Sequence, residues 1–558
     1  MEMVNIKING MPLSVPAGST ILEAARYAGI NIPTLCWMKD INEIGACRIC
    51  VVEVARARTL VTACVFPVNE GMEIYTNTPR VMNARKMTLE LMLSTHEKKC
   101  LSCVRSENCE LQKLCRDYGV EDANAFEGEN PQSPLDETTL HMIRDNNKCI
   151  LCRRCVAACE NQFVGVIGPN GRGFDTHIGC AFEKDLDDVA CVSCGQCIVN
   201  CPTGALREKD QIDEVVAAIA DPKKHVVVQT APSVRAALGE EFGMPIGTNV
   251  EGKMVAALRR LGFDRVFDTD FGADMTIMEE AHEFVERVQN GGVLPMITSC
   301  SPGWIKFCEF YYPELLPHLS TCKSPQQMQG ALIKTWYAET NEIDPKDIVS
   351  VSVMPCTAKK FEINRDDQDA AGIPDVDVVL TVRELARMIK RANIDLTMLP
   401  DEKFDPTMDV STGAAVIFGA TGGVMEAALR TAADTLTGKS LDSIDYKEVR
   451  GTDGIKEAVY NVAGMDVKVA VASGLSNANE ILKKVKNGEA DYHFIEIMCC
   501  PGGCVNGGGM PIQSSSVRNF VDLRKERAKV LYEEDKNLPL RKSHDSPVVK
   551  KCYAEFLG

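Results

Sequence analysis

The sequence predicts a multidomain protein in which small α+β modules precede one large α/β domain. Of its 25 cysteines, 17 lie before residue 202 and none lies between residues 202 and 299. Beyond residue 210, helix-period segments such as 213–219 and 253–261 alternate with short apolar strands at 225–229, 264–268 and 349–354. That alternation is typical of α/β layers with mainly parallel strands. We expect domains at 1–79, 80–127, 140–209 and 210–558 of the 558 residues.

Charge and composition exclude several classes of protein. The chain carries 61 basic and 78 acidic residues, a net charge of −17, which argues against binding nucleic acid or an anionic membrane surface. Its first residues show no basic stretch leading into an apolar run, and no window approaches a membrane-spanning length. We therefore expect a cytoplasmic protein whose cysteines bind metal rather than form disulfides.

The first module reads as a small β-grasp fold. An alternating strand at 4–8 is followed by an Asn9-Gly10 turn, a second strand, and a Thr20-x-x-Glu23 capping box that opens a helix. Four cysteines follow with the spacing C-x10-C-x2-C-x13-C: Cys36, Cys47, Cys50 and Cys64.

Their spacing indicates a two-iron site. The close pair, Cys47 and Cys50, can bind one iron, and the outer two can reach a second across a folded loop. The module resembles the plant-type [2Fe–2S] ferredoxin domain, although its first spacing is wider than the usual C-x4-C. A structural zinc site is the alternative.

The second module offers three thiolates and one imidazole. The donors, in the spacing H-x3-C-x2-C-x5-C, are His96, Cys100, Cys103 and Cys109. They suit a [4Fe–4S] cluster of raised potential or a Cys3His zinc site. The neighbouring [2Fe–2S]-like module favours the cluster. Cys115 falls outside the spacing, and we expect it to be a packing residue.

The third module contains the same motif twice, C-x2-C-x2-C-x3-C. In two-cluster ferredoxins the fourth cysteine of each run binds the other cluster. The first expected [4Fe–4S] set is Cys149, Cys152, Cys155 and Cys201. The second is Cys191, Cys194, Cys197 and Cys159. Four cofactors in a row form an electron pathway, which requires a terminus.

Three loops in the large domain supply that terminus. They read TSCSPGW (298–304), MPCTAKKFE (354–362) and EIMCCPGGCVNGGG (496–509). Together they resemble the signature loops of [FeFe] hydrogenases. With the modules in this order, the whole chain resembles the large monomeric clostridial-type members of that family.

The resemblance implies reversible reduction of two protons to H2 at an H-cluster, a [4Fe–4S] joined to a diiron unit with CO, cyanide and azadithiolate ligands. It assigns Cys356, Cys500 and Cys504 to the [4Fe–4S] cubane, with Cys504 bridging to the diiron unit. Lys359 would bond one cyanide, and Pro232 with Ser233 another. The residues expected to line the pocket are Met354, Phe418 and Met498, and glycines 502, 503 and 507–509 would let the backbone approach the cluster.

The resemblance also implies a proton relay. Its members would be Cys300, Glu280, Ser320 and Glu283, with Arg287 at the outer end. Glu280 and Glu283 are spaced i, i+3 on a predicted helix and share a face.

One position departs from the family. The first loop usually reads Cys-Cys-Pro, and here it reads Cys300-Ser301-Pro302. Either Ser301 binds the cubane through oxygen while Cys300 relays protons, the arrangement that we favour, or the loop shifts and Cys300 becomes the ligand. A further cysteine, Cys499, stands beside Cys500.

The expected partners are ferredoxin or a similar small carrier, H2 and protons, and the hydrogenase maturases. The alternatives are a hydrogen sensor, a non-catalytic hydrogenase-like iron–sulfur protein, and an electron-input subunit of an NADH or formate dehydrogenase complex. The second and third loops argue against the last of these, because such a subunit has no use for them.

Overall fold

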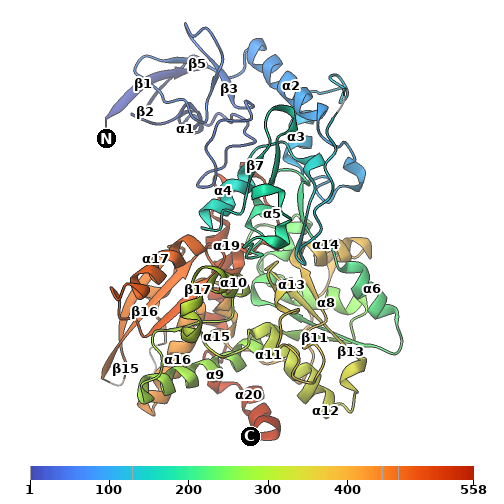
Figure 1. The fold of residues 1–558 in the computed structure, drawn as a ribbon, viewed down its shortest axis with the longest axis vertical. Helices are drawn as coiled ribbons and strands as arrows, with labels where there is room; N and C mark the ends of the chain where they lie inside the picture. The colour runs from blue at the N-terminus through green and yellow to red at the C-terminus, as the bar shows by residue number, and fades with distance from the viewer. Residues whose placement is uncertain (1, 129, 441–443, 463) are drawn as a thin grey trace.

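A computed structural model describes residues 2–128, 130–440, 444–462 and 464–558. Figure 1 shows the N-terminal modules gathered at one end of the molecule and the large domain at the other, with the third module between them. Among the described residues, no helix is long and apolar enough to span a membrane. The mixed, multidomain architecture confirms the predicted fold class at that level.

The first module is a five-stranded sheet with one helix. Its strands, in the order β2-β1-β5-β3-β4, are β1 (Met3–Ile8), β2 (Met11–Pro16), β3 (Val51–Val54), β4 (Val61–Thr62) and β5 (Glu73–Tyr75). β1 pairs antiparallel with β2 and parallel with β5. The predicted turn is present, with positive φ at Asn9 and Gly10. The capping box of α1 (Ile21–Tyr27) is also present, and the Thr20 hydroxyl accepts a bond from the Glu23 amide at 3.2 Å.

The next two modules are built from short elements. Helices α2 (Pro79–Ser94) and α3 (Glu110–Asp117) carry the second module. In the third, β6 (Met142–Arg144) pairs with β9 (Leu206–Glu208), and β7 (Ile167–Asn170) pairs with β8 (His177–Cys180). Helices α4 (Arg154–Asn161) and α5 (Gln196–Asn200) each start within one of the two cysteine runs. The motif repeat is therefore also a structural repeat.

The large domain holds two four-stranded sheets. The first, in the order β11-β10-β13-β14, is entirely parallel and comprises β10 (His225–Thr230), β11 (Arg265–Asp268), β13 (Ile348–Met354) and β14 (Val378–Thr381). The second, in the order β12-β17-β16-β15, comprises β12 (Met296–Ile297), β15 (Ile455–Val462), β16 (Met465–Ser473) and β17 (Phe494–Met498), and only β15 runs antiparallel. The predicted strands and mainly parallel order are confirmed.

Helices cover both sheets. The predicted helices are α6 (Ile212–Ala220) and α8 (Glu251–Leu261), which pack on the first sheet. Helices α9 (Thr269–Asn290) and α16 (Gly423–Thr437) bury a small-residue and aliphatic face against the second sheet. The other helices named in Figure 1 are α10 (Pro302–Tyr311), α11 (Pro325–Leu332), α12 (Ala338–Thr340), α13 (Lys359–Glu362), α14 (Val382–Arg391), α15 (Gly413–Val416), α17 (Leu475–Lys486), α19 (Leu523–Asn537) and α20 (Pro547–Cys552).

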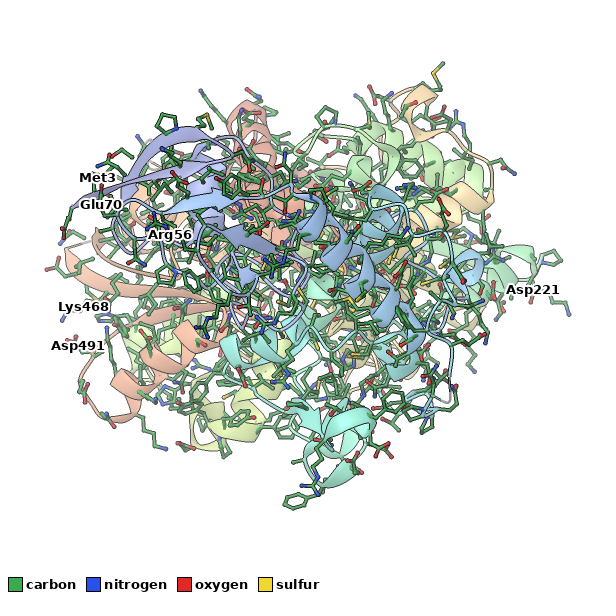
Figure 2. All side chains as sticks on the ribbon, turned by 90° about the horizontal axis from the view of Figure 1, so that it is seen from above. Met3, Arg56, Glu70, Asp221, Lys468 and Asp491 are labelled. Carbon is green, nitrogen blue, oxygen red and sulfur yellow. The ribbon has the colours of Figure 1, made fainter. Side chains whose placement is uncertain are left out.

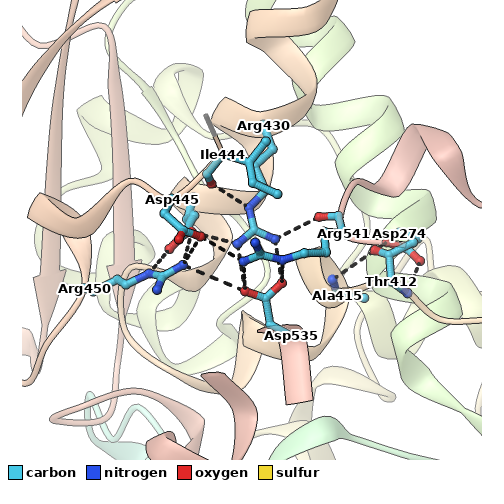
Figure 3. A network of polar contacts seen from close by, with 10 residues as sticks. Asp274, Thr412, Ala415, Arg430, Ile444, Asp445, Arg450, Asp535 and Arg541 are labelled. Atoms are coloured by element: carbon cyan, nitrogen blue, oxygen red, sulfur yellow. Dashed lines mark hydrogen bonds and ion pairs between the residues drawn. The ribbon is translucent and has the colours of Figure 1, made fainter. Parts of the chain in front are cut away.

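A buried ion network fastens the C-terminal helices to this core (Figure 3). Arg430 on α16 donates to both carboxylate oxygens of Asp535 on α19, at 2.8 and 2.9 Å. Arg541 donates to the same carboxylate at 2.7 Å. The Lys468–Asp491 pair, by contrast, lies at the solvent-exposed rim (Figure 2), where an ion pair contributes little to stability. Helix α19 is therefore part of the core.

The third module is packed directly on the large domain. The Gln162 amide donates to the Cys499 carbonyl at 2.8 Å, and the Thr357 hydroxyl donates to the Ser193 carbonyl at 2.8 Å. A Cβ placed on Gly508 would lie 2.3 Å from the Cys194 carbonyl oxygen. The loops that carry the cysteines on both sides of this interface are thus held in fixed positions.

Candidate metal centre

The four cysteines of the first module form two close pairs. The Cys36 and Cys47 thiols each accept a bond from the other residue's amide at 3.4 Å, and the Cys50 and Cys64 sulfur atoms are 3.3 Å apart. Each pair joins an inner cysteine to an outer one, so the thiols pair differently from the expected grouping of Cys47 with Cys50. The backbone explains the difference, because Arg48 has a left-handed φ of 62° that turns the chain between the two inner residues.

One thiol of each pair is the more readily ionised, because the pKa is lowered at Cys47 and Cys50 and raised at Cys36 and Cys64. The Cys36 thiol interacts with Cys47 and lowers the pKa of Cys47 to about 6. The thiolate is the form of cysteine that binds metal, so a depressed pKa favours ligation.

His96 in the second module is buried and suited to binding a metal. Burial lowers the pKa of His96 to about 4, which keeps the imidazole neutral, and its Nδ1 atom has no hydrogen-bond partner within the described residues. A neutral imidazole with a free ring nitrogen is a metal ligand. Cys115 packs in the apolar cluster beneath α2 and α3, and its pKa is raised by burial and by the nearby Cys109 and Cys100.

The structure gathers the doubled cysteine motif into two cavities. One cavity is lined by Cys149, Cys152, Cys155 and Cys201. The other is lined by Cys159, Cys191, Cys194 and Cys197. Each run thus contributes three cysteines to one cavity and its fourth to the other, which is the arrangement expected from the sequence.

A larger cavity lies where strands of both sheets of the large domain end. Strands β10, β13 and β17 run directly into its walls, as in open α/β folds, where ligands bind outside the carboxyl ends of the strands. The lining includes every pocket and ligand residue expected in this domain: Pro232, Ser233, Cys300, Ser301, Met354, Cys356, Lys359, Phe418, Met498, Cys500 and Cys504.

Sequence reasoning missed other parts of the wall. Thr269 and Ala273 come from the first turns of α9, Pro325 and Gln326 from the start of α11, and Gly419 from the turn before α16. None of these residues belongs to a metal-ligand spacing or a loop motif. Their positions at the starts of helices are the only sequence feature that indicates a site. Gly419 is required there, because a Cβ would lie 2.5 Å from Leu531 of α19.

The polar groups of the cavity are mostly engaged. Lys359 is buried and donates to the Ser324 hydroxyl at 2.8 Å, the Glu362 carboxylate at 2.9 Å and the Cys300 carbonyl at 3.3 Å. The Ser233 hydroxyl is fully buried and has no hydrogen-bond partner among the described residues. An unpaired buried hydroxyl is costly, so its presence in the wall fits a cofactor with polar ligands.

A line of polar groups leads from the cavity toward the surface. Glu280 is fully buried, burial raises its pKa to about 8, and neither of its carboxylate oxygens has a hydrogen-bond partner among the described residues. Ser320 donates to Glu283 at 3.2 Å, and Arg287 donates to Glu283 at 2.6 Å. At the inner end, burial and the nearby Glu280 raise the pKa of the Cys300 thiol. The structure thus places the five expected relay residues in one region, with direct hydrogen bonds among the outer three, Ser320, Glu283 and Arg287.

The glycines of the third loop do not all serve the cavity. Gly503 and Gly507 line it, and Gly503 has a φ of 95°, in the left-handed region. Gly508 instead packs on Gly195 and Cys194 of the third module, and Gly509 packs on Thr381. Gly502 faces the side chain of Arg524, so the expected role in approaching the cofactor does not extend to Gly502, Gly508 and Gly509.

At the unusual first loop, Ser301 and Cys499 meet. Ser301 is the N-cap residue of α10, and its hydroxyl accepts a bond from the Cys499 amide at 3.2 Å. Both residues line the cavity. Within the described residues, no three histidine, cysteine or carboxylate side chains converge as they do around a single metal ion. The thiols stand around cavities instead, which fits clusters of several irons.

Comparison with known proteins bears on the whole chain. Residues 224–508 match the iron-only hydrogenase large subunit, C-terminal domain, and 521–558 match the iron hydrogenase small subunit. Residues 1–79 match a 2Fe-2S cluster binding domain, 85–124 the iron–sulfur binding region of NADH-ubiquinone oxidoreductase G, and 148–205 a 4Fe-4S dicluster domain.

Two relatives match over the entire chain. The NADP-reducing hydrogenase subunit HndD of Solidesulfovibrio fructosivorans is 50% identical over 100% of this chain and 96% of its own length. Iron hydrogenase 1 of Clostridium pasteurianum is 46% identical over 100% of this chain and 97% of its own. A solved structure of apo [FeFe]-hydrogenase HydA1 from Chlamydomonas reinhardtii is 42% identical, covers 63% of this chain and 95% of that one, and gives a TM-score of 0.55.

Proposed function

Because the chain belongs to the [FeFe]-hydrogenase family and interconverts H2 with protons and electrons, we propose that its thiol-lined cavity holds an H-cluster fed by its N-terminal modules. The observation that supports this most strongly is the cavity itself, which gathers three separate cysteine loops at the carboxyl ends of strands from two sheets. Hydrogen-sensing and non-catalytic alternatives are not favoured, since the relatives that match the whole chain are hydrogenases.

Cys356, Cys500 and Cys504 would hold the cubane, with a fourth donor from the side of Ser301. Ser233, whose hydroxyl has no partner among the described residues, and Lys359 would bond the cyanide ligands. When bound, the H-cluster supplies heterolytic cleavage of H2 and its reverse. The apolar wall of Met354, Phe418 and Met498 keeps water from the thiols, which strengthens every charge interaction inside the cavity.

Glu280 would be the central proton carrier. Its pKa of about 8 lies close to neutrality, where a group both takes up and releases protons efficiently. The Cys300 thiol would exchange a proton with Glu280, and the Ser320 hydroxyl would pass it on to Glu283. The ion pair with Arg287 holds Glu283 in place at the outer end.

The modules would carry electrons through one [2Fe–2S] and three [4Fe–4S] clusters. The last cysteine cavity lies directly against the catalytic one, because Cys194 lines the former and interacts with Cys499, which lines the latter. This contact would let electrons pass from the third module to the H-cluster without a diffusing carrier.

The electron partner is proposed to be ferredoxin or a similar small carrier, and dedicated maturases would insert the diiron unit. One relative is described as a subunit of an NADP-reducing hydrogenase. A partner subunit is therefore a second source of electrons to test.

Iron and infrared analysis of the full chain tests the cofactor. Maturated protein should contain about 20 iron, and protein made without the maturases about 18, because only the diiron unit is missing. CO and cyanide infrared bands and H2 evolution from reduced viologen should appear only in the maturated protein. Maturated protein without those bands would refute the proposal.

Donor dependence tests the pathway. We expect Cys155→Ala, which removes a ligand from one module cavity, to lower H2 evolution with reduced ferredoxin far more than with reduced viologen, since the small dye can reach the large domain directly. Cys180→Ala, a buried cysteine of the same module outside both cysteine cavities, is the matched control. Equal losses with both donors would mean that the modules only support the fold.

A further inference from the structure

The first loop lacks the second cysteine of its family, yet the cavity still contains a thiol beyond those assigned to the cubane and the relay. Cys499 is 3% exposed, lines the cavity, and stands next to the assigned ligand Cys500 in the third loop. We propose that Cys499, and not Ser301, supplies the fourth ligand of the H-cluster cubane. This inference rests on the proposed function, because it concerns one ligand of the cofactor proposed there.

Cys499 and Ser301 lie next to each other in the cavity wall. The Cys499 amide donates to the Ser301 hydroxyl at 3.2 Å, so the residue that lacks a thiol and the residue that has one meet in the same wall. The Cys499 sulfur lies over the first turn of α10, where it would be 2.7 Å from a Cβ placed on Gly303. Glycine at 303 therefore leaves the space that the Cys499 side chain occupies, two residues beyond Ser301.

A cysteine thiol and a serine hydroxyl differ in how well they bind iron. Iron–sulfur clusters select soft, readily ionised thiolates, whereas a serine hydroxyl is a harder donor that gives up its proton at far greater cost. The Ser301 hydroxyl is also already engaged by the Cys499 amide. With both groups in one wall, the thiol is the better ligand.

The Cys499 thiol lies between two cysteine-lined cavities. It interacts with the Cys500 thiol on the catalytic side and with the Cys194 thiol of the neighbouring module cavity. The module cavity already has four cysteines in its wall, whereas the catalytic cavity has only three assigned to the cubane. Cys499 therefore completes the set that is one donor short.

The assignment frees Cys300 for proton transfer. Under it, the first loop supplies no cubane ligand, and the Cys300 thiol remains beside Glu280. The loop then has no need to shift its register, and Ser301, at the N-cap position of α10, becomes a positioning residue whose hydroxyl holds the Cys499 amide.

The test uses full-length protein made without the maturases, in which iron content and the EPR spectrum of the reduced clusters report the cubane directly. The parent chain should hold about 18 iron. We expect Cys499→Ala to contain only about 14 iron and to lose the EPR signal of one [4Fe–4S] cluster. Ser301→Ala should keep the parent iron content and that EPR signal. The double variant Ser301→Cys/Cys499→Ala should regain the cluster, because it returns a thiol to the same wall.

Cys308→Ala is the matched control. Cys308 is buried in the same apolar cluster as Cys499 but does not line the cavity, so its loss should leave the iron content unchanged. A purely structural role for Cys499 would not be rescued by a thiol at position 301.

Three results would overturn the proposal. They are an intact cubane in Cys499→Ala, loss of the cubane in Ser301→Ala, and loss of the cubane in Cys300→Ala. A parent chain that never contains a fifth cluster would instead refute the proposed function, so the two failures are distinguishable.

Discussion

The N-terminal modules and the large domain build their sites in opposite ways. In the second module the four donors lie between residues 96 and 109, within one short stretch of chain. In the large domain the cavity wall runs from residue 231 to residue 507 and draws on loops after several strands. The apolar cluster of the second module is small and includes several cysteines, whereas the large domain includes three extended clusters made mostly of aliphatic and aromatic side chains. We therefore expect the fold of the large domain to depend less on metal than that of a module.

The comparison predicts that catalysis can be removed without harming the large domain. We expect Cys356→Ala to abolish H2 evolution, because the cubane loses a ligand. The loss should be roughly a thousandfold or more, as when an essential catalytic group is removed. Its thermal unfolding should stay near that of the parent chain, since Cys356 lies outside all three apolar clusters. Calorimetry and a viologen assay on the same sample check this. Unfolding of the large domain in this variant would show that its fold also depends on metal.

A substitution in the proton relay should have the next largest effect on turnover. Glu280→Gln keeps the shape of the side chain but removes its ability to exchange protons, so turnover should fall by roughly 10² to 10⁴. The CO and cyanide bands should be unchanged. Glu286→Gln, on the exposed face of the same helix, is the control. Near-normal turnover in Glu280→Gln would remove Glu280 from the relay.

Glu280 also makes a testable contribution to the pH dependence of stability. Burial raises its pKa from 4.5 to about 8, so the folded state holds a proton that the unfolded state releases between those values. The stabilisation is complete below pH 4.5 and is lost as the pH rises through 8. Glutamine cannot ionise, so above pH 8 Glu280→Gln should be more stable than the parent, by up to roughly 5 kcal/mol. Identical pH profiles would contradict this.

A smaller effect, on the free energy of unfolding, is expected where the third module joins the large domain. Glu208 of the third module is 3% exposed and accepts bonds from Arg383 at 2.7 Å and Arg387 at 2.7 Å. Although burial raises its pKa, the two arginines hold it below the ordinary value. Glu208→Gln leaves Arg383 buried without its charge partner, which should lower the free energy of unfolding by about 3–5 kcal/mol near pH 7.

The pH dependence of that loss has a definite sign. A depressed pKa stabilises the fold above the unfolded value of 4.5, and the contribution disappears as the pH falls through the lower folded value. The difference between Glu208→Gln and the parent should therefore shrink in acid. Urea titrations at neutral and acid pH check it, and a constant difference would mean that charge is not the cause.

The smallest effect on stability is expected at the N-cap of α1 in the first module. Thr20→Ala removes the hydroxyl that accepts from the Glu23 amide, and should destabilise α1 by about 1 kcal/mol. Thr20→Ser keeps the hydroxyl and is the control. Because the module has its own small core, visible absorption of its cluster should report the change while H2 evolution with viologen does not. A change in viologen activity would show that the modules and the large domain are energetically coupled.

Much of the molecule was predictable because its signals are local. The capping box at Thr20 and Glu23, the turn at Asn9 and Gly10, and the two ferredoxin-type cysteine runs each lie within one short segment, and each has the expected geometry. The cavity residues of the three signature loops were reached only through the family resemblance. Thr269 and Gln326 were missed because nothing in their own segments distinguishes a helix start in a cavity wall from any other helix start.

What the sequence by itself determined is the number of cysteine sets, their order and the chemistry of each donor, because ligand spacing along a loop is a local property. In the first module and in the large domain, tertiary structure alone decided which donors share a wall. Cys36 faces Cys47 because the chain turns at Arg48, and Cys499 meets Ser301 because β17 ends beside the start of α10. Residues 301 and 499 are far apart along the chain, so their contact depends on how the second sheet and α10 pack. It cannot be predicted from the spacing of residues in the sequence.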